Sequence, residues 1–280
     1  MDMTVRIVTD STCDLPPTVI NDLEITVIPL YINVGSKGYL DGIEISRQEF
    51  YARLPSFRPH PTTAAPGQDV FQKSYFRLVE EGATQILSIH VSQKLSAVFG
   101  IALSAAQSIQ MVPVTVLDSR QLTLGTGFLA ETAARMAKEG AHVNEILPVL
   151  EDQISRTHVF AALDTVEFLR RSGRTSFAMA SIASLLHVKP LLRMYDGNPT
   201  SERVRTTGKA IRRLIELLEQ AAPLERVALV HTHSPEKADY LRRQASHLMP
   251  EGEIPSVDIT PVIGAHLGPG AAGFACISRR

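Results

Sequence analysis

The sequence has little of what marks a secreted, metal-binding or nucleic-acid-binding protein. Its only two cysteines, Cys13 and Cys276, lie far apart and in no metal-ligand spacing, which suits a reducing compartment better than a disulfide framework. The 28 basic and 29 acidic residues leave a formal net charge of -1, so no overall field favours nucleic acid or an anionic membrane. We therefore expect a soluble, cytoplasmic protein that does not bind nucleic acid.

Long apolar runs and several catalytic signatures are also missing. No stretch approaches the ~18 apolar residues of a membrane span, so no stable membrane insertion is expected. Neither a G-x-x-x-x-G-K-[ST] phosphate loop nor a G-x-S-x-G nucleophile turn occurs, and Ser96 lacks the glycines of such a turn. His231 and His233 share one face of a predicted strand without an acidic cluster, which disfavours a metal site. We expect no catalytic residue, no metal and no cofactor.

What is present is the alternation of apolar runs and helical periodicity that is typical of α/β proteins. Runs at residues 5–9, 25–30, 85–91 and 114–118 are each followed by a helical pattern, as a parallel sheet flanked by helices requires. Further on, a strand at 158–163, a hairpin around Asp196-Gly197 and a strand at 226–232 indicate a second sheet of mixed direction. We predict an N-terminal α/β lobe over residues 1–150 and a C-terminal α/β lobe over 151–280.

Two segments between the predicted strands have unusual composition. Residues 54–67 contain four prolines and are too apolar for a flexible linker, so they predict an ordered loop without regular structure. We expect this loop, near residues 55–67, to contact the other lobe. Residues 264–273 are rich in glycine on both sides of His266, which indicates that a group approaches the backbone or that the chain turns tightly into the final strand. An imidazole in such an apolar run suits a carboxylate or a hydroxyl rather than a triphosphate.

Hydroxyl groups dominate the other polar loops, at residues 10–12, 62–63 and 92–96. Loops that follow parallel strands gather around the ligand crevice of an open sheet, although any one serine here could simply cap a helix. A basic cluster includes Arg171, Arg174 and Arg205, and it is either a solvated face or a docking surface for an acidic partner.

Several of these motifs, in this order along the whole chain, resemble the DegV family of FakB-like bacterial fatty-acid-binding proteins. They are residues 9–16 (TDSTCDLP), Pro61-Thr-Thr63, Leu95-Ser96, Leu117-Asp-Ser119, residues 164–169 with Gly173-Arg174, Lys189-Pro190 and residues 266–270. The resemblance implies a two-lobe fold that encloses one long-chain fatty acid between the lobes. It also implies a non-enzyme that presents this acid to a fatty acid kinase, which forms the acyl phosphate for phospholipid synthesis.

The resemblance also assigns the head-group site. The family's carboxylate-binding threonine falls on Thr63, its loop serine on Ser96, and its loop histidine on His266. This sequence departs from the family pattern beside them, with alanine at Ala64, Ala65 and Ala97 and valine at Val98. Among the apolar residues, Phe99, Leu185, Leu186 and Ile263 are expected to line the acyl tunnel. The length and unsaturation of the acyl chain, the existence of a kinase partner and the oligomeric state stay open.

The main alternative is an enzyme, a kinase or transferase acting on a small carboxylate in the interlobe cleft. Such an enzyme needs a nucleotide loop or a paired acid and base, and neither occurs with suitable spacing. Binding alone is energetically sufficient, because burying an acyl chain of ~15 methylenes at ~0.8 kcal/mol each offers about 12 kcal/mol.

Overall fold

The computed structural model describes residues 4–173 and 189–280, and the chain divides into two compact units. The first unit comprises residues 1–30 and 65–155, and the second comprises residues 31–64 and 156–280. The sequence predicts one boundary near residue 150 and does not predict that residues 31–64 join the second unit. Arg174, Leu185 and Leu186, which the sequence singles out, lie outside the described residues.

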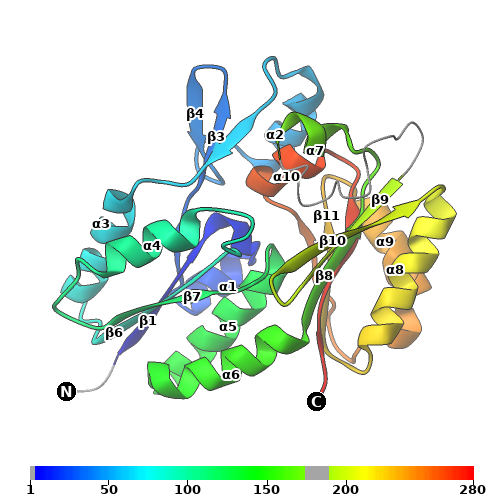
Figure 1. The fold of residues 1–280 in the computed structure, drawn as a ribbon. Helices are drawn as coiled ribbons and strands as arrows, with labels where there is room; N and C mark the ends of the chain where they lie inside the picture. Colours follow the sequence, from blue (N-terminus) through cyan, green and yellow to red (C-terminus); the bar gives the residue numbers. More distant parts are fainter. Residues whose placement is uncertain (1–3, 174–188) are drawn as a thin grey trace. The chain divides into compact units, whose positions relative to one another are not determined.

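The first unit is built on a four-stranded parallel sheet with the strand order β2-β1-β6-β7. Its strands are β1 (Val5–Asp10), β2 (Thr26–Ile28), β6 (Gln85–His90) and β7 (Val114–Asp118). Its helices are α1 (Pro17–Asp22), α3 (Gln68–Glu80), α4 (Val98–Ala106), α5 (Leu124–Lys138) and α6 (Val143–Arg156). Helices α3 and α4 cover one face of the sheet and α5 covers the other (Figure 1). The predicted parallel sheet flanked by helices is confirmed.

The second unit contains a six-stranded mixed sheet with the order β10-β9-β8-β13-β11-β12, in which only β11 and β12 pair in parallel. Its strands are β8 (Thr157–Ala162), β9 (Lys189–Tyr195), β10 (Asn198–Val204), β11 (Leu224–His231), β12 (Ser256–Asp258) and β13 (Ala272–Ser278). Its helices are α7 (Glu167–Arg171), α8 (Thr207–Ala221), α9 (Pro235–Gln244) and α10 (Pro261–Leu267). The mixed sheet is as predicted, and Asp196 and Gly197 both have the positive φ of the expected hairpin turn.

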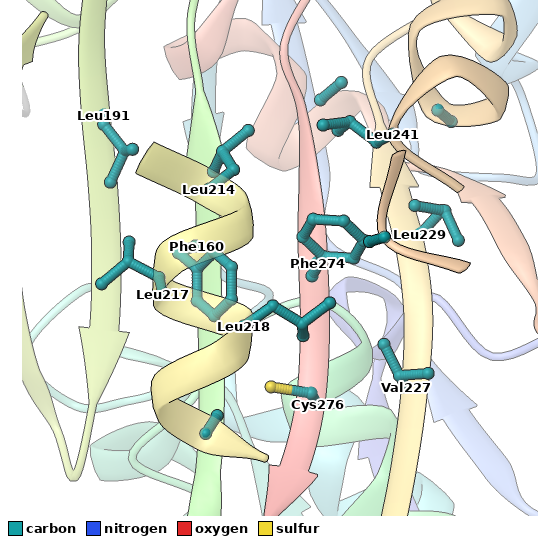
Figure 2. Packing of buried hydrophobic residues seen from close by; sticks show 14 of the residues in the cluster. Phe160, Leu191, Leu214, Leu217, Leu218, Val227, Leu229, Leu241, Phe274 and Cys276 are labelled. Carbon is teal, nitrogen blue, oxygen red and sulfur yellow. The ribbon is translucent and has the colours of Figure 1, made fainter. Parts of the chain in front are cut away.

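Helices α8 and α9 pack on one face of this sheet and form the main core of the unit (Figures 1 and 2). The buried residues of α8 recur every three or four positions, which places them on one stripe: they are Ala210, Leu214, Leu217, Leu218 and Ala221. Beneath them, Phe160 of β8 and Phe274 of β13 are paired in register, with ring centroids 5.8 Å apart. The two phenylalanine rings therefore form the part of the sheet surface against which α8 packs.

Residues 31–64 form a small three-stranded antiparallel sheet, in the order β4-β3-β5, together with helix α2. The elements are β3 (Tyr31–Val34), β4 (Lys37–Leu40), α2 (Arg47–Arg53) and β5 (Thr62–Ala64). The prediction that residues 54–67 lack regular structure was wrong at β5. Its threonines follow Pro61 directly, and their β-branched side chains and free N–H groups allow Thr62 and Thr63 to pair with β3.

Helix α2 begins at a capping box, in which Ser46 is the N-cap and Glu49 follows three residues later. The Ser46 hydroxyl accepts a hydrogen bond from the backbone N–H of Glu49 at 3.1 Å. We expect Ser46→Ala to lower the free energy of unfolding by about 1 kcal/mol, because this N–H loses its partner at the helix start. Urea denaturation of the two proteins measures the difference. Ser36→Ala, at an exposed hairpin turn, is a suitable control, and an equal effect of both substitutions would contradict the capping role.

The glycine-rich segment before the last strand was predicted as a loop, but its first part is helix α10. Pro261 at the first turn has its φ fixed near the helical value and lacks an N–H that would be unsatisfied there, so it favours a helix start. The helix ends where Gly268 adopts a positive φ of 75°. His266 therefore lies in the last turn of a helix rather than in a loop.

The described part of the chain offers neither a membrane span nor a metal site. Within residues 4–173 and 189–280, every helix is too short or too polar to cross a bilayer. In the same ranges, no three histidine, cysteine, aspartate or glutamate side chains gather in a way that could hold a metal ion.

Candidate functional site

Two of the three predicted head-group residues meet in the second unit. The Thr63 Oγ1 and His266 Nε2 atoms are 3.0 Å apart and share a hydrogen bond, and both side chains are half-buried. Thr63 reaches this position because it is paired with the fully buried Ile32 of β3, and His266 because it ends α10. A hydroxyl that accepts a hydrogen bond from an imidazole keeps its own hydrogen to donate to a carboxylate.

Helix α10 is held in place by Arg47 and Tyr51 of α2 and by Asp41, which precedes α2. The Tyr51 hydroxyl donates to the backbone oxygen of Ile259 at 2.8 Å, and a Cβ atom at Gly264 would lie only 2.1 Å from the Tyr51 oxygen. Arg47 also donates to the backbone oxygen of Asp258, and the Thr260 hydroxyl donates to the carboxylate of the buried Asp41. Together these contacts fix the start of α10 against residues 31–64 and so determine where His266 lies.

The later glycines of the segment also face specific side chains. A Cβ atom at Gly268 would lie 2.2 Å from the ring of Phe168 in α7, and one at Gly270 would lie 2.3 Å from a carboxylate oxygen of Asp164. The sequence predicted either a close approach to this backbone or a tight turn. The structure shows both: the protein's own side chains approach this backbone, and the positive φ of Gly268 and Gly270 turns the chain into β13.

A second histidine, His60, contacts the end of α10, although it belongs to no motif of the sequence. Its Nε2 atom donates to the backbone oxygen of Ala265 at 2.9 Å, and its ring packs against Phe168 with centroids 5.6 Å apart. Partial burial is the largest cause that lowers the pKa of His60, against the opposing effect of the hydrogen bond to Ala265. Nothing in the sequence pairs His60 with Ala265, 205 positions away, so only the fold reveals this contact.

Ser96, the third predicted residue, belongs to the first unit and is half-buried just before α4. Its hydroxyl oxygen accepts from the backbone N–H of Val98, the first residue of α4, at 3.4 Å. The N-cap of α4 is Ala97, so Ser96 is not the capping residue of this helix. The hydroxyl hydrogen is not used in the contact with Val98, and Ser96 can donate it to another group.

The polar loop at residues 10–12 serves a structural purpose. The buried Asp10 carboxylate accepts hydrogen bonds from His90 Nδ1 at 3.0 Å and from the backbone N–H groups of Thr12 and Val91, each at 3.0 Å. Burial raises the pKa of Asp10, but these hydrogen bonds and the attraction of His90 outweigh it, so the pKa lies below its usual value. Asp10 therefore clamps the ends of β1 and β6 together.

The hydrogen-bond chain from Asp10 continues through His90 to Ser88 and Tyr75. His90 Nε2 lies 2.7 Å from the Ser88 hydroxyl, which in turn accepts from Tyr75 at 2.9 Å. Asp, His and Ser are the residue types of a hydrolase triad, but all three side chains here are completely buried. A substrate cannot reach the Ser88 hydroxyl, so this arrangement is a structural network rather than a catalytic one.

The predicted basic cluster lies in the second unit. Arg171 pairs with Glu167 on its own helix at 2.7 Å; Arg171 is exposed and Glu167 is half-buried, which is compatible with a solvated helix face. Arg205 is exposed at the end of β10, and Arg174 lies outside the described residues. The structure thus places Arg171 and Arg205 at the surface, where a partner could reach them.

Comparisons with known proteins agree with the motifs. The model of the DegV family, described as an uncharacterised protein family, matches residues 4–279. A DegV domain-containing protein of Streptomyces coelicolor is 36% identical over 284 residues, with 100% of both chains covered.

Solved structures of related proteins have the same fold. One is DegV from Bacillus subtilis, described as a fatty acid binding protein, with a TM-score of 0.90 and 32% identity, covering 99% of this chain and 100% of that chain. Another is a DegV family protein from Thermus thermophilus, described by its fatty acid binding, with a TM-score of 0.89 and 31% identity, covering 99% and 100%. Because the family model spans nearly all of the sequence, this chain belongs to the DegV family.

Proposed function

We propose that this protein binds one long-chain fatty acid and holds its carboxylate with the hydroxyl groups of Thr63 and Ser96, supported by His266. The protein carries out no catalysis and presents the acid to a fatty acid kinase, which forms the acyl phosphate. Its own part is to bind, orient and release the acid. The fatty acid binding described for the related proteins of Bacillus subtilis and Thermus thermophilus supports the ligand class.

The observation that carries the proposal is the hydrogen bond between Thr63 and His266. The two residues are 203 positions apart in the sequence, and separate elements, β5 and α10, bring them to 3.0 Å. If His266 donates from Nε2 to the Thr63 oxygen, the Thr63 hydroxyl hydrogen is oriented away from the imidazole and toward an acceptor. A carboxylate is the acceptor that fits this arrangement without a fixed positive charge.

Hydroxyl donors suit a protein that must give up its ligand. The net contribution of each hydrogen bond to a charged group is about 1.5–3 kcal/mol, whereas burial of ~15 methylenes contributes about 12 kcal/mol. The tail therefore supplies most of the affinity and the head group supplies orientation. A buried lysine or arginine would bind the carboxylate more strongly but would hinder its transfer to a kinase.

Docking of the kinase is assigned to the exposed basic residues Arg171 and Arg205, together with Arg174. Positive side chains at the rim of an interface mainly accelerate association with an acidic partner and steer its orientation. This role is compatible with the pairing of the exposed Arg171 to Glu167 near the surface, because a partner's carboxylate can replace such an ion pair at little cost.

The direct test removes the two hydroxyl groups. The double variant Thr63→Val, Ser96→Ala is expected to bind hexadecanoate about 100-fold more weakly and to retain no acid through gel filtration, because two charge-assisted hydrogen bonds of about 1.5 kcal/mol each are lost. Native mass spectrometry of the purified proteins measures the retained acid, and competition with a fluorescent fatty acid measures the affinity.

The matched control is the double variant Thr62→Val, Ser104→Ala. Thr62 is the exposed neighbour of Thr63 on β5, and Ser104 is an exposed serine of α4 whose hydroxyl bonds only to its own helix. The control should retain acid as the unchanged protein does. Equal retention in the test variant and the control would refute the head-group assignment.

A further inference from the structure

A pocket of about 250 Å³ lies entirely within the second unit, between the first turns of α8 and α9. It sits at the carboxyl ends of β8 and β11, which run in the same direction because both are antiparallel to β13. In α/β sheets, ligands commonly bind beyond the carboxyl ends of the strands. Thr63, Ser96 and His266 do not line this pocket, so it is separate from the proposed head-group site.

The pocket exists because the sheet surface changes from large to small side chains along β8 and β13. Phe160 and Phe274 are paired in register, and two residues further the pair on the same face is Ala162 and Ala272. The helix above contributes Ala210 at this point. Helices that rest on the phenylalanine rings leave space over the alanines. Leu214 and Leu241, both labelled in Figure 2, complete the apolar wall of the pocket.

The mouth of the pocket carries two lysines held by one carboxylate. Lys189 donates to Asp164 Oδ1 at 2.8 Å, and Lys237 donates to Asp164 Oδ2 at 2.6 Å and to the backbone oxygen of Gly270 at 2.8 Å. The Lys189 and Lys237 side chains are partly exposed, at 28% and 36%. An ammonium group has three donors, so Lys189 keeps two and Lys237 keeps one for a ligand.

The other charges that line the pocket leave its mouth without a net charge, so the attraction for an anion comes from the unused ammonium donors. The exposed Glu236 also lines the pocket, and with Asp164 it balances the two lysines. Arg205 follows Val204, the residue of β10 that is paired with Lys189, and does not line the pocket. Asp164 holds both ammonium groups at fixed positions on one side of the mouth, which reduces the ordering cost of binding there.

We propose that this pocket is a second ligand site, which binds a medium-chain carboxylate with its alkyl chain on the alanine and leucine wall and its head group at Lys189 and Lys237. The volume of about 250 Å³ is below the range of about 300–1,000 Å³ for drug-sized ligands, so the pocket is too small to enclose a complete long-chain acid. The carboxylate oxygens accept charge-assisted hydrogen bonds from the remaining N–H donors of the two lysines. The site goes beyond the proposed function and does not depend on it.

To test this proposal, the protein is first saturated with hexadecanoate and then titrated with octanoate in a calorimeter. Octanoate should bind at one saturable site, and propanoate, which lacks the chain, and 1-octanol, which lacks the charge, should each bind at least tenfold more weakly. The variant Lys189→Gln should weaken octanoate at least threefold and leave 1-octanol unchanged. Lys209→Gln, a nearby lysine of α8 outside the pocket, is the matched control and should change neither.

Filling the pocket tests its location. Ala210→Phe should abolish octanoate binding while hexadecanoate is still retained, and the smaller Ala210→Leu should weaken it at least tenfold if the phenylalanine variant does not fold. The proposal would be overturned if a folded variant with the pocket filled still bound octanoate, or if Thr63→Val weakened octanoate binding. It would also be overturned if the unchanged protein bound no octanoate at millimolar concentration. If hexadecanoate does not load, the same variants titrated without it judge the pocket separately from the proposed function.

Discussion

Gly264→Ala is expected to lower the free energy of unfolding by about 3 kcal/mol, at the upper end of the usual cost of overpacking a core. The new Cβ atom would lie 2.1 Å from the Tyr51 oxygen and 2.6 Å from the ring carbon that bears it. Tyr51 cannot move away easily, because it is buried, its hydroxyl bonds to Ile259, and its ring stacks on His233 with centroids 5.8 Å apart. Relief of the clash therefore requires α10 to shift.

A shift of α10 has a second consequence, because His266 lies in its last turn. The Thr63 to His266 distance should lengthen, and retention of hexadecanoate should fall together with stability. Urea denaturation gives the first quantity and native mass spectrometry gives the second. Loss of stability with full retention would separate α10 from the proposed head-group site.

The matched control for Gly264 is Gly208, a helical glycine of the same unit. A Cβ atom at Gly208 meets nothing within 4 Å, and its φ is not positive. Gly208→Ala should therefore stabilise the protein by about 0.5–1 kcal/mol, the usual gain for replacing glycine by alanine within a helix. Combining Gly264→Ala with Tyr51→Leu should cost less than the sum of the two single changes, because the leucine lacks the atoms that clash. Strict additivity would show that Tyr51 is not the source of the strain.

The regular elements of the fold were predictable because their signals are local. Alternating strands and helices are visible in apolar runs that end at caps and turns, so the parallel sheet, the Asp196-Gly197 hairpin and the Ser46 cap follow from short stretches of sequence. The membership of residues 31–64 in the second unit is not local. It depends on contacts such as that of Tyr51 with Ile259, which lie 208 positions apart.

The candidate site was predictable in part for the same reason. Thr63 and His266 were found through motifs, and their contact in the second unit agrees with that pairing. The polar groups of the first unit looked equally functional in the sequence, but burial decides their role: Asp10 and His90 are completely enclosed and hold two strands together. Sequence patterns reveal which groups are polar, whereas only packing reveals which of them a ligand can reach.

The second large effect is expected at Asp10, where Asp10→Asn should lower the free energy of unfolding by about 3 kcal/mol at pH 7. An unsatisfied buried hydrogen-bonding group costs about 1–3 kcal/mol, and the amide nitrogen of asparagine would face the N–H of Val91. His90 can respond by moving its proton from Nδ1 to Nε2, but Ser88 then loses the acceptor for its hydroxyl hydrogen. The substitution therefore leaves at least one buried donor without a partner wherever the His90 proton lies.

The pH dependence of stability gives this prediction a sign. The pKa of Asp10 in the folded protein lies below its value of 3.8 in the unfolded chain, so the folded state favours the charged carboxylate. The resulting stabilisation is fully present above pH 3.8 and is lost as the pH falls below 3.8 through the folded pKa. The difference in unfolding free energy between the unchanged protein and Asp10→Asn should thus be constant near neutral pH and shrink in acid.

Urea denaturation of both proteins at a series of pH values measures this difference. The matched control is Asp69→Asn, which changes an exposed aspartate paired with Lys73 at 3.2 Å. Such surface ion pairs contribute little, so we expect a change of less than about 0.5 kcal/mol at any pH. A difference for Asp10→Asn that grows as the pH falls would mean that the folded state disfavours the Asp10 carboxylate. In that case the hydrogen bonds from His90, Thr12 and Val91 would not compensate for its burial.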